Sequence, residues 1–538
     1  PETWDVLSRW TNTTSEPICL TVDGLAKYDM ENVLQPALAE SWECSEDGLT
    51  WTFHIREGVA WVDSQGRKVD EVKADDWVAS MQHNMDFAGA SAAEVFAAFI
   101  VNGEDYYLKN ISDFTQVGVE APDDRTLVYH LTQPVPAFES LLSYCGMFAP
   151  LCRSYYESQG GTFGPDHDNG NYGTGPNNIA YCGPYLITSW TEKNSFVFDQ
   201  NPTYWNPDSM NIKKINWYYY DGSDPLRGYN DTMAGTIDSA GLGTSALQKA
   251  REDGNFDKYA YLSTDLTGTS RCGFYNLNRQ AFATFADPTI GISPQSHESV
   301  DGIDLIGGVV TSDIEDDAAR THLAINNQNF RLALTMALDR GNYHAQRVGD
   351  ELKELSLRNT WIPGNFVTLN ADTTVDISGT ATTFPAGTYY GEIVQAQITA
   401  DGYPMKVWDP AAADGLGSGD GYDGWYNPTA AKEYLAKAVE ELAAQGMEIT
   451  KENPIQIDYY TCSIVETWNN QANVYKQVIE ANLDGLVQVN IVDTPDTTSY
   501  QNTSYFNDTG ADNCTDVNIG SGWSADYADP ASYLDIMQ

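Results

Sequence analysis

The residues whose types and spacing could do chemistry gather in one stretch near the end of the sequence, Ser521-Gly522-Trp523-Ser524-Ala525-Asp526-Tyr527-Ala528-Asp529-Pro530. Asp529 before Pro530 is typical of a helix start, with the aspartate as N-cap. Asp526 has no such local explanation; it lies between two aromatic residues, after a predicted strand at 516–519 and a Gly-Ser-Gly turn. A carboxylate walled by aromatic rings could hold a cation, because a charge-assisted hydrogen bond gains strength in a partly dry site. An ordinary loop carboxylate is the alternative.

The charge of the whole chain limits its partners. Its 538 residues include 76 acidic and 29 basic side chains, a net charge of −47, and no lysine or arginine cluster resembles a phosphate-binding face. Nucleic acid and anionic membrane surfaces are therefore not expected partners, because both attract basic surfaces. The hydrophobic fraction of 42% and the length allow roughly two to four units with their own cores.

Patterns typical of catalysis and metal binding are missing from the sequence. There is no Gly-x-Ser-x-Gly turn and no His-Glu-x-x-His pair, since His297-Glu298 is followed by Asp301 where the second histidine would stand. The seven histidines and eight cysteines are dispersed. We therefore expect neither an enzyme nor a metal or other cofactor. A chance pair of carboxylates for hydrolysis, among 76 acidic residues, stays open as a remote alternative.

Hydrophobic periodicity predicts an α/β arrangement in the second half of the chain. A helix is expected over 428–445, capped by Asn427, and a second apolar helical stripe over 474–483. Strands are expected at 455–460 and 487–492. The continuous apolar residues of 330–338 predict a helix buried in the core. Strands that alternate with helices in this order suit a mixed α/β lobe.

Several ordered motifs resemble those of the family 5 extracellular solute-binding proteins, the receptors of peptide and nickel ABC importers. The motifs are Leu38-Ala39-Glu40-Ser41-Trp42, the segment Asp47–Val59, Cys182-Gly183-Pro184-Tyr185-Leu186-Ile187, Asn201-Pro202-Thr203-Tyr204-Trp205, the segment Phe330–Arg340, and the stretch 522–530 that contains Asp526. Within Asp47–Val59, the alternating apolar residues Leu49, Trp51, Phe53 and Ile55 predict a half-buried strand. Each is weak alone, but their order and spacing cover nearly the whole chain.

The resemblance implies an α/β fold of the periplasmic-binding-protein type (type II, cluster C), with two main lobes, an extra subdomain and a hinge. Lobe I would comprise 1–30 and 183–268, lobe II, the extra subdomain, 31–182, and lobe III 269–538. Lobe III departs from the family pattern by surface insertions near 285–326 and 371–426. Family members continue past the Trp-x-Ala-Asp-Tyr motif, so we expect part of the last lobe to be missing from this sequence.

The resemblance also assigns candidate binding residues. In peptide-binding members the aspartate of the Trp-x-Ala-Asp-Tyr motif pairs with the α-ammonium group of the peptide, which here gives this role to Asp526, walled by Trp523 and Tyr527. Strand edges that pair with the peptide backbone are expected at Thr14 and Ser15 and at Phe274 and Tyr275. The nickel-binding subgroup uses a pocket histidine, but Ser524 follows Trp523 here, so no metal is expected. Candidate cations for a ligand carboxylate are Lys353, Arg358 and Lys406.

The resemblance predicts the substrate-binding component of an ABC importer, which captures oligopeptides between lobes I and III by hinge closure and delivers them to the permease. The same scaffold could instead bind an oligosaccharide or another small solute, since aromatic residues make up 12% of the chain. We expect a monomer, extracytoplasmic and either anchored as a lipoprotein or periplasmic. We expect that an export signal has been removed from this sequence, and no run of eighteen apolar residues could span a membrane.

Overall fold

The structure is a computed structural model that describes most of the chain. The described residues are 4, 5, 7, 17, 19–29, 31, 33–87, 97–135, 137–143, 148–260, 269–283, 296–300, 303–307, 317–350, 352–353, 357–409, 423–505, 507, 509–523, 525, 529–530 and 532–535. For 296–300 and 303–307 the description covers the backbone alone. Within these residues, no helix is both long enough and apolar enough to cross a membrane.

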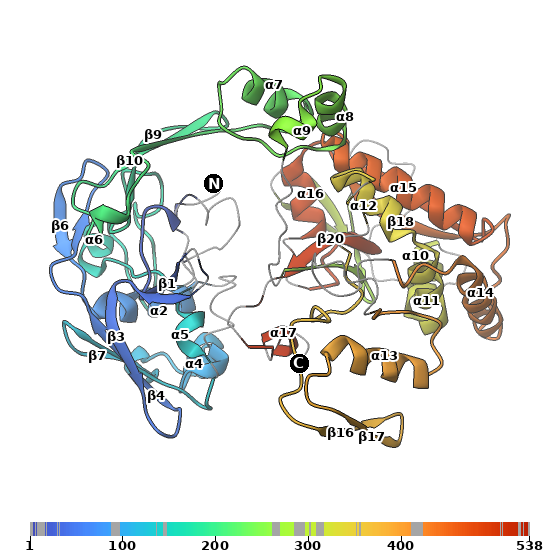
Figure 1. Cartoon of the computed structure of the whole chain (residues 1–538), viewed down its shortest axis with the longest axis horizontal. Helices are drawn as coiled ribbons and strands as arrows, with labels where there is room; N and C mark the ends of the chain where they lie inside the picture. The colour runs from blue at the N-terminus through green and yellow to red at the C-terminus, as the bar shows by residue number, and fades with distance from the viewer. Residues whose placement is uncertain are drawn as a thin grey trace. The chain divides into compact units, whose positions relative to one another are not determined.

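The chain divides into two compact units, one built mainly on residues 1–219 and the other mainly on residues 220–525 (Figure 1). Both units mix helices and strands, which agrees with the predicted α/β class. The predicted division has three lobes instead of two units. The residues at which each lobe begins and ends stay a prediction.

The first unit is dominated by antiparallel sheets. Its strands are β1 (Ala26–Tyr28), β2 (Leu34–Pro36), β3 (Ala39–Cys44), β4 (Thr50–Ile55), β5 (Ala60–Val62), β6 (Lys68–Glu71), β7 (Val119–Asp123), β8 (Thr126–His130), β9 (Tyr185–Thr191), β10 (Ser195–Gln200) and β11 (Lys214–Tyr218). Its helices are α2 (Asp75–Asp86), α4 (Gly103–Tyr107), α5 (Phe138–Leu141), α6 (Arg153–Ser158), α17 (Ser532–Asp535) and the 3₁₀ turns η1 (Phe114–Gln116) and η2 (Pro207–Ser209).

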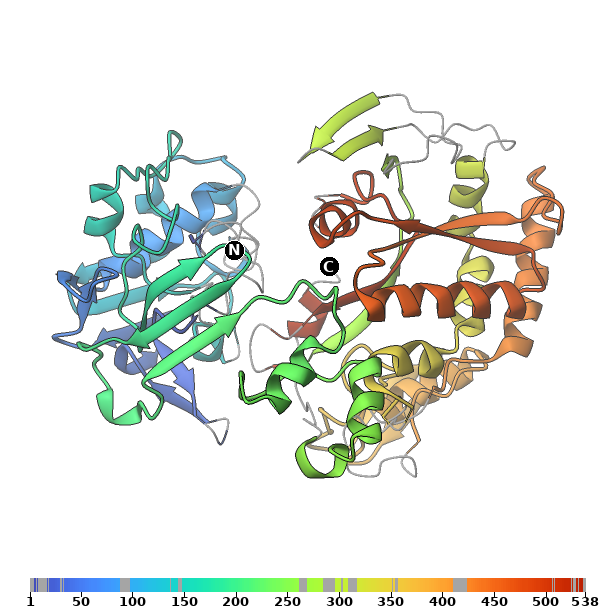
Figure 2. The same ribbon diagram turned by 90° about the horizontal axis from the view of Figure 1, so that it is seen from above.

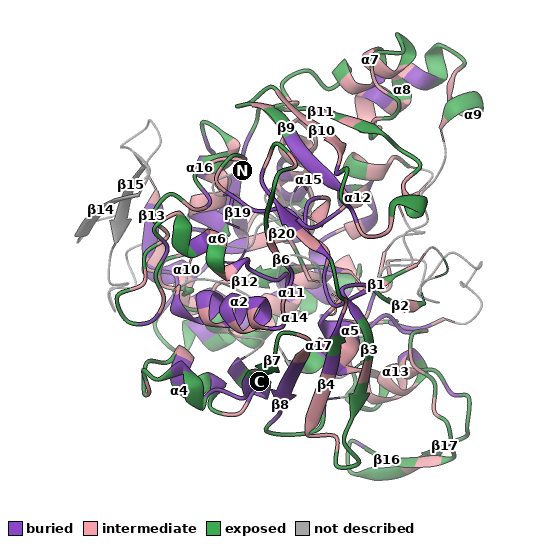
Figure 3. Ribbon diagram, turned by 90° about the vertical axis from the view of Figure 1, so that its left-hand side faces the viewer, coloured by how far each residue is buried: buried purple, intermediate pink, exposed green. Residues whose placement is uncertain are grey.

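The largest sheet of this unit has the strand order β3-β4-β8-β7. Its strand β4 carries the predicted alternation, with Phe53 and Ile55 buried and His54 exposed between them. Because successive side chains of a strand point to opposite faces, this pattern buries one face of β4. In Figure 3 the edge strand β3 is largely exposed and the inner strand β8 is largely buried. The predicted half-buried strand is confirmed.

The motif that contains Gly183 is explained by a close approach of two backbone segments. A Cβ atom at position 183 would stand 2.5 Å from the carbonyl carbon of Thr21 and 2.5 Å from the amide nitrogen of Val22. The Gly183 amide donates to the carbonyl oxygen of Thr21 at 2.8 Å. Only glycine therefore fits without moving the backbone.

Replacing Gly183 with alanine should destabilise the first unit by about 1 to 3 kcal/mol, because backbone atoms cannot move aside as cheaply as a flexible side chain. Gly175→Ala is a matched control, since nothing lies within 4 Å of a Cβ built there. Urea unfolding of both variants beside the wild type measures the difference. Equal midpoints for the two variants would contradict this explanation of the motif.

The aromatic pair Tyr204 and Trp205 is tied to a buried carboxylate. The Tyr204 hydroxyl and the Trp205 indole N–H donate to Oδ2 of Asp23 at 2.8 and 2.7 Å. Burial raises the pKa of the Asp23 carboxyl, while the charge of Lys27 and these two hydrogen bonds oppose the shift. The ammonium nitrogen of Lys27 lies 5.1 Å from the centre of the Trp205 ring. The motif therefore holds together segments that are far apart in sequence.

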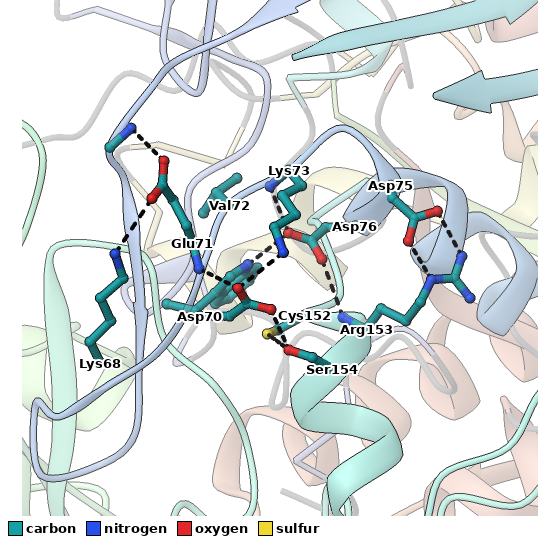
Figure 4. Close-up of polar contacts among 12 residues, drawn as sticks. Lys68, Asp70, Glu71, Val72, Lys73, Asp75, Asp76, Cys152, Arg153 and Ser154 are labelled. Carbon is teal, nitrogen blue, oxygen red and sulfur yellow. Dashed lines mark hydrogen bonds and ion pairs between the residues drawn. The ribbon is translucent and has the colours of Figure 1, made fainter. Parts of the chain in front are cut away.

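Polar contacts join the N-terminal ends of α2 and α6 (Figure 4). Arg153 donates from Nη2 to Oδ1 of Asp75 at 3.0 Å. The neighbouring Asp76 is buried and accepts at Oδ2 from the Trp61 indole at 2.8 Å and from the Lys73 amide at 2.9 Å. Its other oxygen accepts from the Arg153 amide at 3.2 Å. Burial raises the pKa of Asp76 from 3.8 to about 6, although the three hydrogen bonds oppose this shift.

The raised pKa of Asp76 predicts a pH dependence of stability. The folded state binds this proton more tightly than the unfolded state, so the contribution is fully present below about pH 4 and is lost as the pH rises through about 6. The loss should reach at most about 3 kcal/mol. Between pH 4.5 and 7.5 the urea midpoint of the wild type should therefore fall relative to that of Asp76→Asn, whose amide does not titrate. A constant difference between them would contradict the prediction.

The second unit combines long helices with four small sheets among its described residues. Its helices are α7 (Arg227–Met233), α8 (Thr244–Glu252), α9 (Phe256–Tyr259), α10 (Asp317–Asn326), α11 (Gln328–Ala337), α12 (Arg340–Val348), α13 (Tyr390–Ala400), α14 (Pro428–Ala443), α15 (Glu466–Asn482) and α16 (Thr497–Ser504). Its strands are β12 (Ser270–Tyr275), β13 (Ala281–Ala283), β14 (Ser296–Val300), β15 (Ile303–Gly307), β16 (Thr373–Ile377), β17 (Thr380–Phe384), β18 (Ile455–Thr461), β19 (Val487–Asp493) and β20 (Val517–Trp523).

The predicted order of strand, helix and strand is confirmed in this unit. Strands β18 and β19 pair in parallel, with Ile455 opposite Val487, and α15 connects them and packs along both (Figure 2). Helix α14 begins at its cap Asn427, whose side chain accepts from the Ala430 amide. Helix α11 supplies buried apolar side chains to the core, as its continuous apolar sequence predicts.

Two expectations for this unit need correction. The insertion near 285–326 was expected on the surface, but its last part forms α10, which buries Ala324 and Ile325 in the same core as α11. The Gly-Ser-Gly segment before Trp523 was expected to turn, but it continues β20 as far as Trp523. Glycines weaken a strand in isolation, and here pairing with β12 supplies the hydrogen bonds that keep them extended.

Candidate ligand-binding site

The candidate site is built on the antiparallel pair β12 and β20. Ser270 lies opposite Trp523, Arg271 opposite Gly522 and Phe274 opposite Asn518, with a register shift between Cys272 and Phe274. The pairing places the predicted strand edge at 274–275 beside the strand that leads to the aspartate motif. Among the described residues, β20 is the one strand that pairs with β12. The other edge of β12 is thus open to an added strand, as far as the described chain extends.

A buried ion cluster holds both strands of the candidate site in place. Arg279 follows β12 and donates from Nη1 to Oδ2 of Asp516, directly before β20, and from Nη2 to Oδ2 of Asp458 on β18, both at 2.8 Å. The same oxygen of Asp516 accepts from the Asp458 amide at 2.8 Å. The two carboxylates raise the pKa of Arg279 despite its burial, and burial raises the pKa of the Asp516 carboxyl against the opposing charge of Arg279. The cluster fixes three segments at one point.

A cavity of about 500 Å³ opens beside this ion cluster. It is lined by Arg279, Phe282, Asp317, Ala318, Thr321, Gln456, Asp458, Lys476, Val489, Asn490, Ile491 and Asp516. None of the predicted binding residues that the structure describes lines it. The described part of the predicted site and this cavity are therefore built from different residues of the second unit.

Trp523 packs against another tryptophan that the sequence did not suggest for the site. The rings of Trp361 and Trp523 stack, with their centres 6.1 Å apart and their planes inclined by 23°. The Ser270 hydroxyl, opposite Trp523 in the ladder, donates to the carbonyl oxygen of Trp361 at 2.6 Å. The aromatic side of the predicted site therefore includes two indole rings, those of Trp361 and Trp523. Trp361 lacks any motif that would have singled it out in the sequence.

The two predicted residues of β12 differ in their surroundings. The side chain of Phe274 is about half exposed, at 51%. Tyr275 packs against the core, and its hydroxyl oxygen lies 2.7 Å from Oγ1 of Thr335 on α11. Burial raises the pKa of Tyr275 to about 12. Phe274 thus offers a ring to a ligand, whereas Tyr275 would contribute through its backbone.

The other predicted binding residues lie outside the described residues. These are Thr14, Ser15, Asp526 and Tyr527. The three candidate cations for a ligand carboxylate are described, and each has a partner. Lys353 pairs with Asp350 at 3.1 Å, Arg358 donates to the carbonyl oxygen of Thr269 at 2.6 Å, and Lys406 pairs with Asp409. The sequence could not reveal these local partners.

Other kinds of chemistry would require metal ligands or reactive thiols among the described residues. Within them, no group of three histidine, cysteine or carboxylate side chains is placed to hold a metal ion. Cys152 and Cys182 are buried thiols, and burial raises the pKa of both, which disfavours the reactive thiolate. The observed arrangement of the candidate site offers a strand edge, exposed aromatic surface and charge, which suits non-covalent binding.

Solved structures of similar fold come from bacterial oligopeptide-binding proteins. The substrate-binding domain of an oligopeptide ABC transporter from Bacillus anthracis matches with a TM-score of 0.61 and 22% sequence identity, over 100% of this chain and 80% of that one. Listeria monocytogenes OppA bound to peptide matches with a TM-score of 0.60 and 20% identity, over 100% of this chain and 81% of that one. At these identities the likeness concerns the fold, and it confirms the predicted type II periplasmic-binding-protein architecture.

Sequence relatives extend over the full length given. The oligopeptide-binding protein AmiA of Streptococcus pneumoniae is 31% identical over 541 aligned residues, which cover 100% of this chain and 72% of AmiA. The oligopeptide-binding protein SarA of Streptococcus gordonii is 29% identical, with 100% and 72% covered. The model of the bacterial extracellular solute-binding proteins, family 5, matches residues 33–538. This chain therefore belongs to the family 5 bacterial extracellular solute-binding proteins.

Proposed function

We propose that this protein is the substrate-binding component of an ABC importer and that its ligands are oligopeptides. The observation that carries the proposal is the edge of β12 that no other described strand covers, in a chain that aligns over its full length with oligopeptide-binding proteins. An extended peptide can add a strand to such an edge, so that main-chain hydrogen bonds supply affinity without fixing the peptide sequence. The half-exposed Phe274 beside this edge would cover one side chain of the peptide.

The roles of individual residues follow from the same proposal. Asp526 would accept the α-ammonium group of the peptide, with Trp523 and Tyr527 beside it, and Thr14, Ser15, Phe274 and Tyr275 would lie along the peptide backbone. The ligand would be enclosed between lobes I and III by hinge closure, and the closed protein would dock on the permease. We further propose that the protein acts as a monomer in an extracytoplasmic location, as a membrane-anchored lipoprotein or in a periplasm, after removal of an export signal.

A second candidate ligand is an oligosaccharide or another small solute. The stacked indoles of Trp361 and Trp523 favour it, because sugar rings pack well on aromatic faces. The two candidate ligands differ in one group. A peptide carries an α-ammonium group that needs an anionic partner, whereas a neutral sugar carries no such group.

Native mass spectrometry of the protein with equimolar pools tests the proposal. One pool contains pentapeptides of mixed sequence, and the other contains neutral oligosaccharides of similar mass. We expect bound masses from the peptide pool alone, and unchanged peptides on release, since no covalent step is involved. Adducts from the sugar pool alone would support the second candidate. Shortened peptides that accumulate with time would indicate a hydrolase and would contradict both.

A further inference from the structure

Helices α7, α8 and α9 form a small group of their own within the second unit (Figure 1). Their apolar side chains pack against one another, apart from the core to which α11, α14 and α15 contribute. The buried members of this smaller core are Tyr229, Ala246 and Ala250, and Leu226, Leu242 and Phe256 lie partly buried beside them. The two described cores share no side chain. A group with a core of its own is able to move as one body.

Hydrogen bonds from the first turn of α8 tie this group to α12 and α15. The Thr244 hydroxyl donates to the carbonyl oxygen of Gln346, in the last turn of α12, at 2.5 Å. The Ser245 hydroxyl donates to Oε1 of Glu466, the first residue of α15. All four residues are partly exposed. Water is therefore able to replace each partner when such a bond breaks, so that the bonds form and break at a modest cost.

The ends of three helices meet at these hydrogen bonds. The N-terminus of α8 meets the carbonyl end of α12, and these ends attract, because a helix carries partial positive charge at its N-terminus and partial negative charge at its C-terminus. In contrast, α8 and α15 approach each other by their N-terminal turns. A Cβ on Gly243, directly before α8, would stand 3.9 Å from Oγ1 of Thr467 on α15. The carboxylate of Glu466 joins these two like-signed ends and offsets their repulsion.

The predicted lobe limits place the two sides of this contact in different lobes. Helix α8 belongs to the part of lobe I predicted at 183–268, whereas α12 and α15 belong to lobe III, predicted at 269–538. Under the proposed function the ligand is enclosed between these two lobes. Hydrogen bonds between partly exposed groups suit a contact that forms when the lobes close and breaks when they open.

We propose that the hydrogen bonds of Thr244 and Ser245 to α12 and α15 form a latch that holds lobes I and III together in the closed form. The latch rests on the proposed function, because the closed form that it holds is the one that encloses a peptide. Glu466 is its central residue, since its carboxylate accepts from Ser245 and also offsets the like-signed ends of α8 and α15. The latch sets the lifetime of the closed form, and therefore the rate at which a peptide leaves.

Loss of the latch should raise the dissociation rate constant koff of a bound peptide and leave the association rate constant kon nearly unchanged. A peptide enters the open form, in which the latch is not made, whereas release requires the latch to break. Ser245→Ala and Glu466→Gln should each raise koff about two- to tenfold, the range for one hydrogen bond. The double variant should release the peptide about as fast as Glu466→Gln alone, because both substitutions remove the same bond. Ser245→Asp should raise koff further, since two carboxylates then face each other.

Surface plasmon resonance measures both rate constants, with the full chain immobilised and one pentapeptide that the wild type binds from the mixed pool. The matched controls are Ser463→Ala and Ser463→Asp. The Ser463 hydroxyl donates to Oδ2 of Asp493 at 2.6 Å, and both residues lie in the predicted lobe III. The same substitutions there disturb a contact of serine with carboxylate inside one lobe, so koff should stay within about twofold of the wild type. Urea unfolding of each variant without peptide checks that the fold is intact.

Two kinds of result would overturn the latch. If koff of Glu466→Gln and Ser245→Asp stays within about twofold of the wild type, if kon falls as much as koff rises, or if the Ser463 variants raise koff equally, the contact does not hold the closed form. The proposed peptide-binding function then stands without it. If the wild type binds no peptide of the mixed pool, the proposed function fails and the latch fails with it.

Discussion

Arg279→Met should lower the free energy of unfolding at pH 7 by about 3 to 5 kcal/mol, because the substitution leaves two carboxylates buried without their counter-ion. The side chains of Asp458 and Asp516 are only 11% and 6% exposed, so water cannot replace the guanidinium. The cluster joins β18 to the segments that flank β12 and β20, and its loss should loosen all three. Urea unfolding, together with hydrogen exchange of the β18 amides, measures both effects.

Two controls make the Arg279 prediction specific. Arg227→Met breaks a pair that is largely exposed, with Asp231, and should cost less than about 1 kcal/mol. Adding Asp458→Asn and Asp516→Asn to Arg279→Met should recover part of the loss, since neutral amides cost less to bury than carboxylates. The deficit of Arg279→Met should also shrink as the pH falls towards 5, because the orphaned carboxylates then take up protons. A deficit that does not change with pH would contradict the electrostatic explanation.

Asp526→Ala should weaken binding of a peptide with a free N-terminus by about 2 to 5 kcal/mol, which corresponds to roughly thirtyfold to several thousandfold in Kd. An ammonium group withdrawn from water needs an anionic hydrogen-bond acceptor, and the motif Trp-x-Ala-Asp-Tyr offers this aspartate. Isothermal titration with one pentapeptide taken from the mixed pool, for the wild type and the variant, measures the loss.

The N-acetylated form of the same peptide separates the ammonium role from general damage. Acetylation removes the positive charge, so it should weaken binding to the wild type strongly and binding to Asp526→Ala little. Asp529→Ala serves as the neighbouring control, because the sequence assigns that aspartate to a helix cap. If the free and the acetylated peptide lose affinity equally on Asp526→Ala, the aspartate acts on the structure and not on the ammonium group.

The sequence alone was sufficient for features that depend on local pattern. The apolar stripe and cap of α14, the strand alternation of β4 and the continuous apolar residues of α11 all appear in the structure where the pattern predicts them. These features follow from hydrogen bonding and burial within one element, so neighbouring residues determine them. The family could also be recognised, because its motifs keep their order along the chain, and the family model matches residues 33–538.

Other features were decided only by tertiary structure, because they join residues that are distant in sequence. Nothing near Gly183 indicates that the backbone of Thr21 lies against it. The glycines before Trp523 predict a turn locally, but pairing with β12 makes them part of β20. The same pairing brings Arg271 over Gly522, while the predicted cations Lys353 and Lys406 turn out to have nearby carboxylates. Local sequence determined which elements form, whereas long-range packing decided which side chains and backbone segments lie against one another.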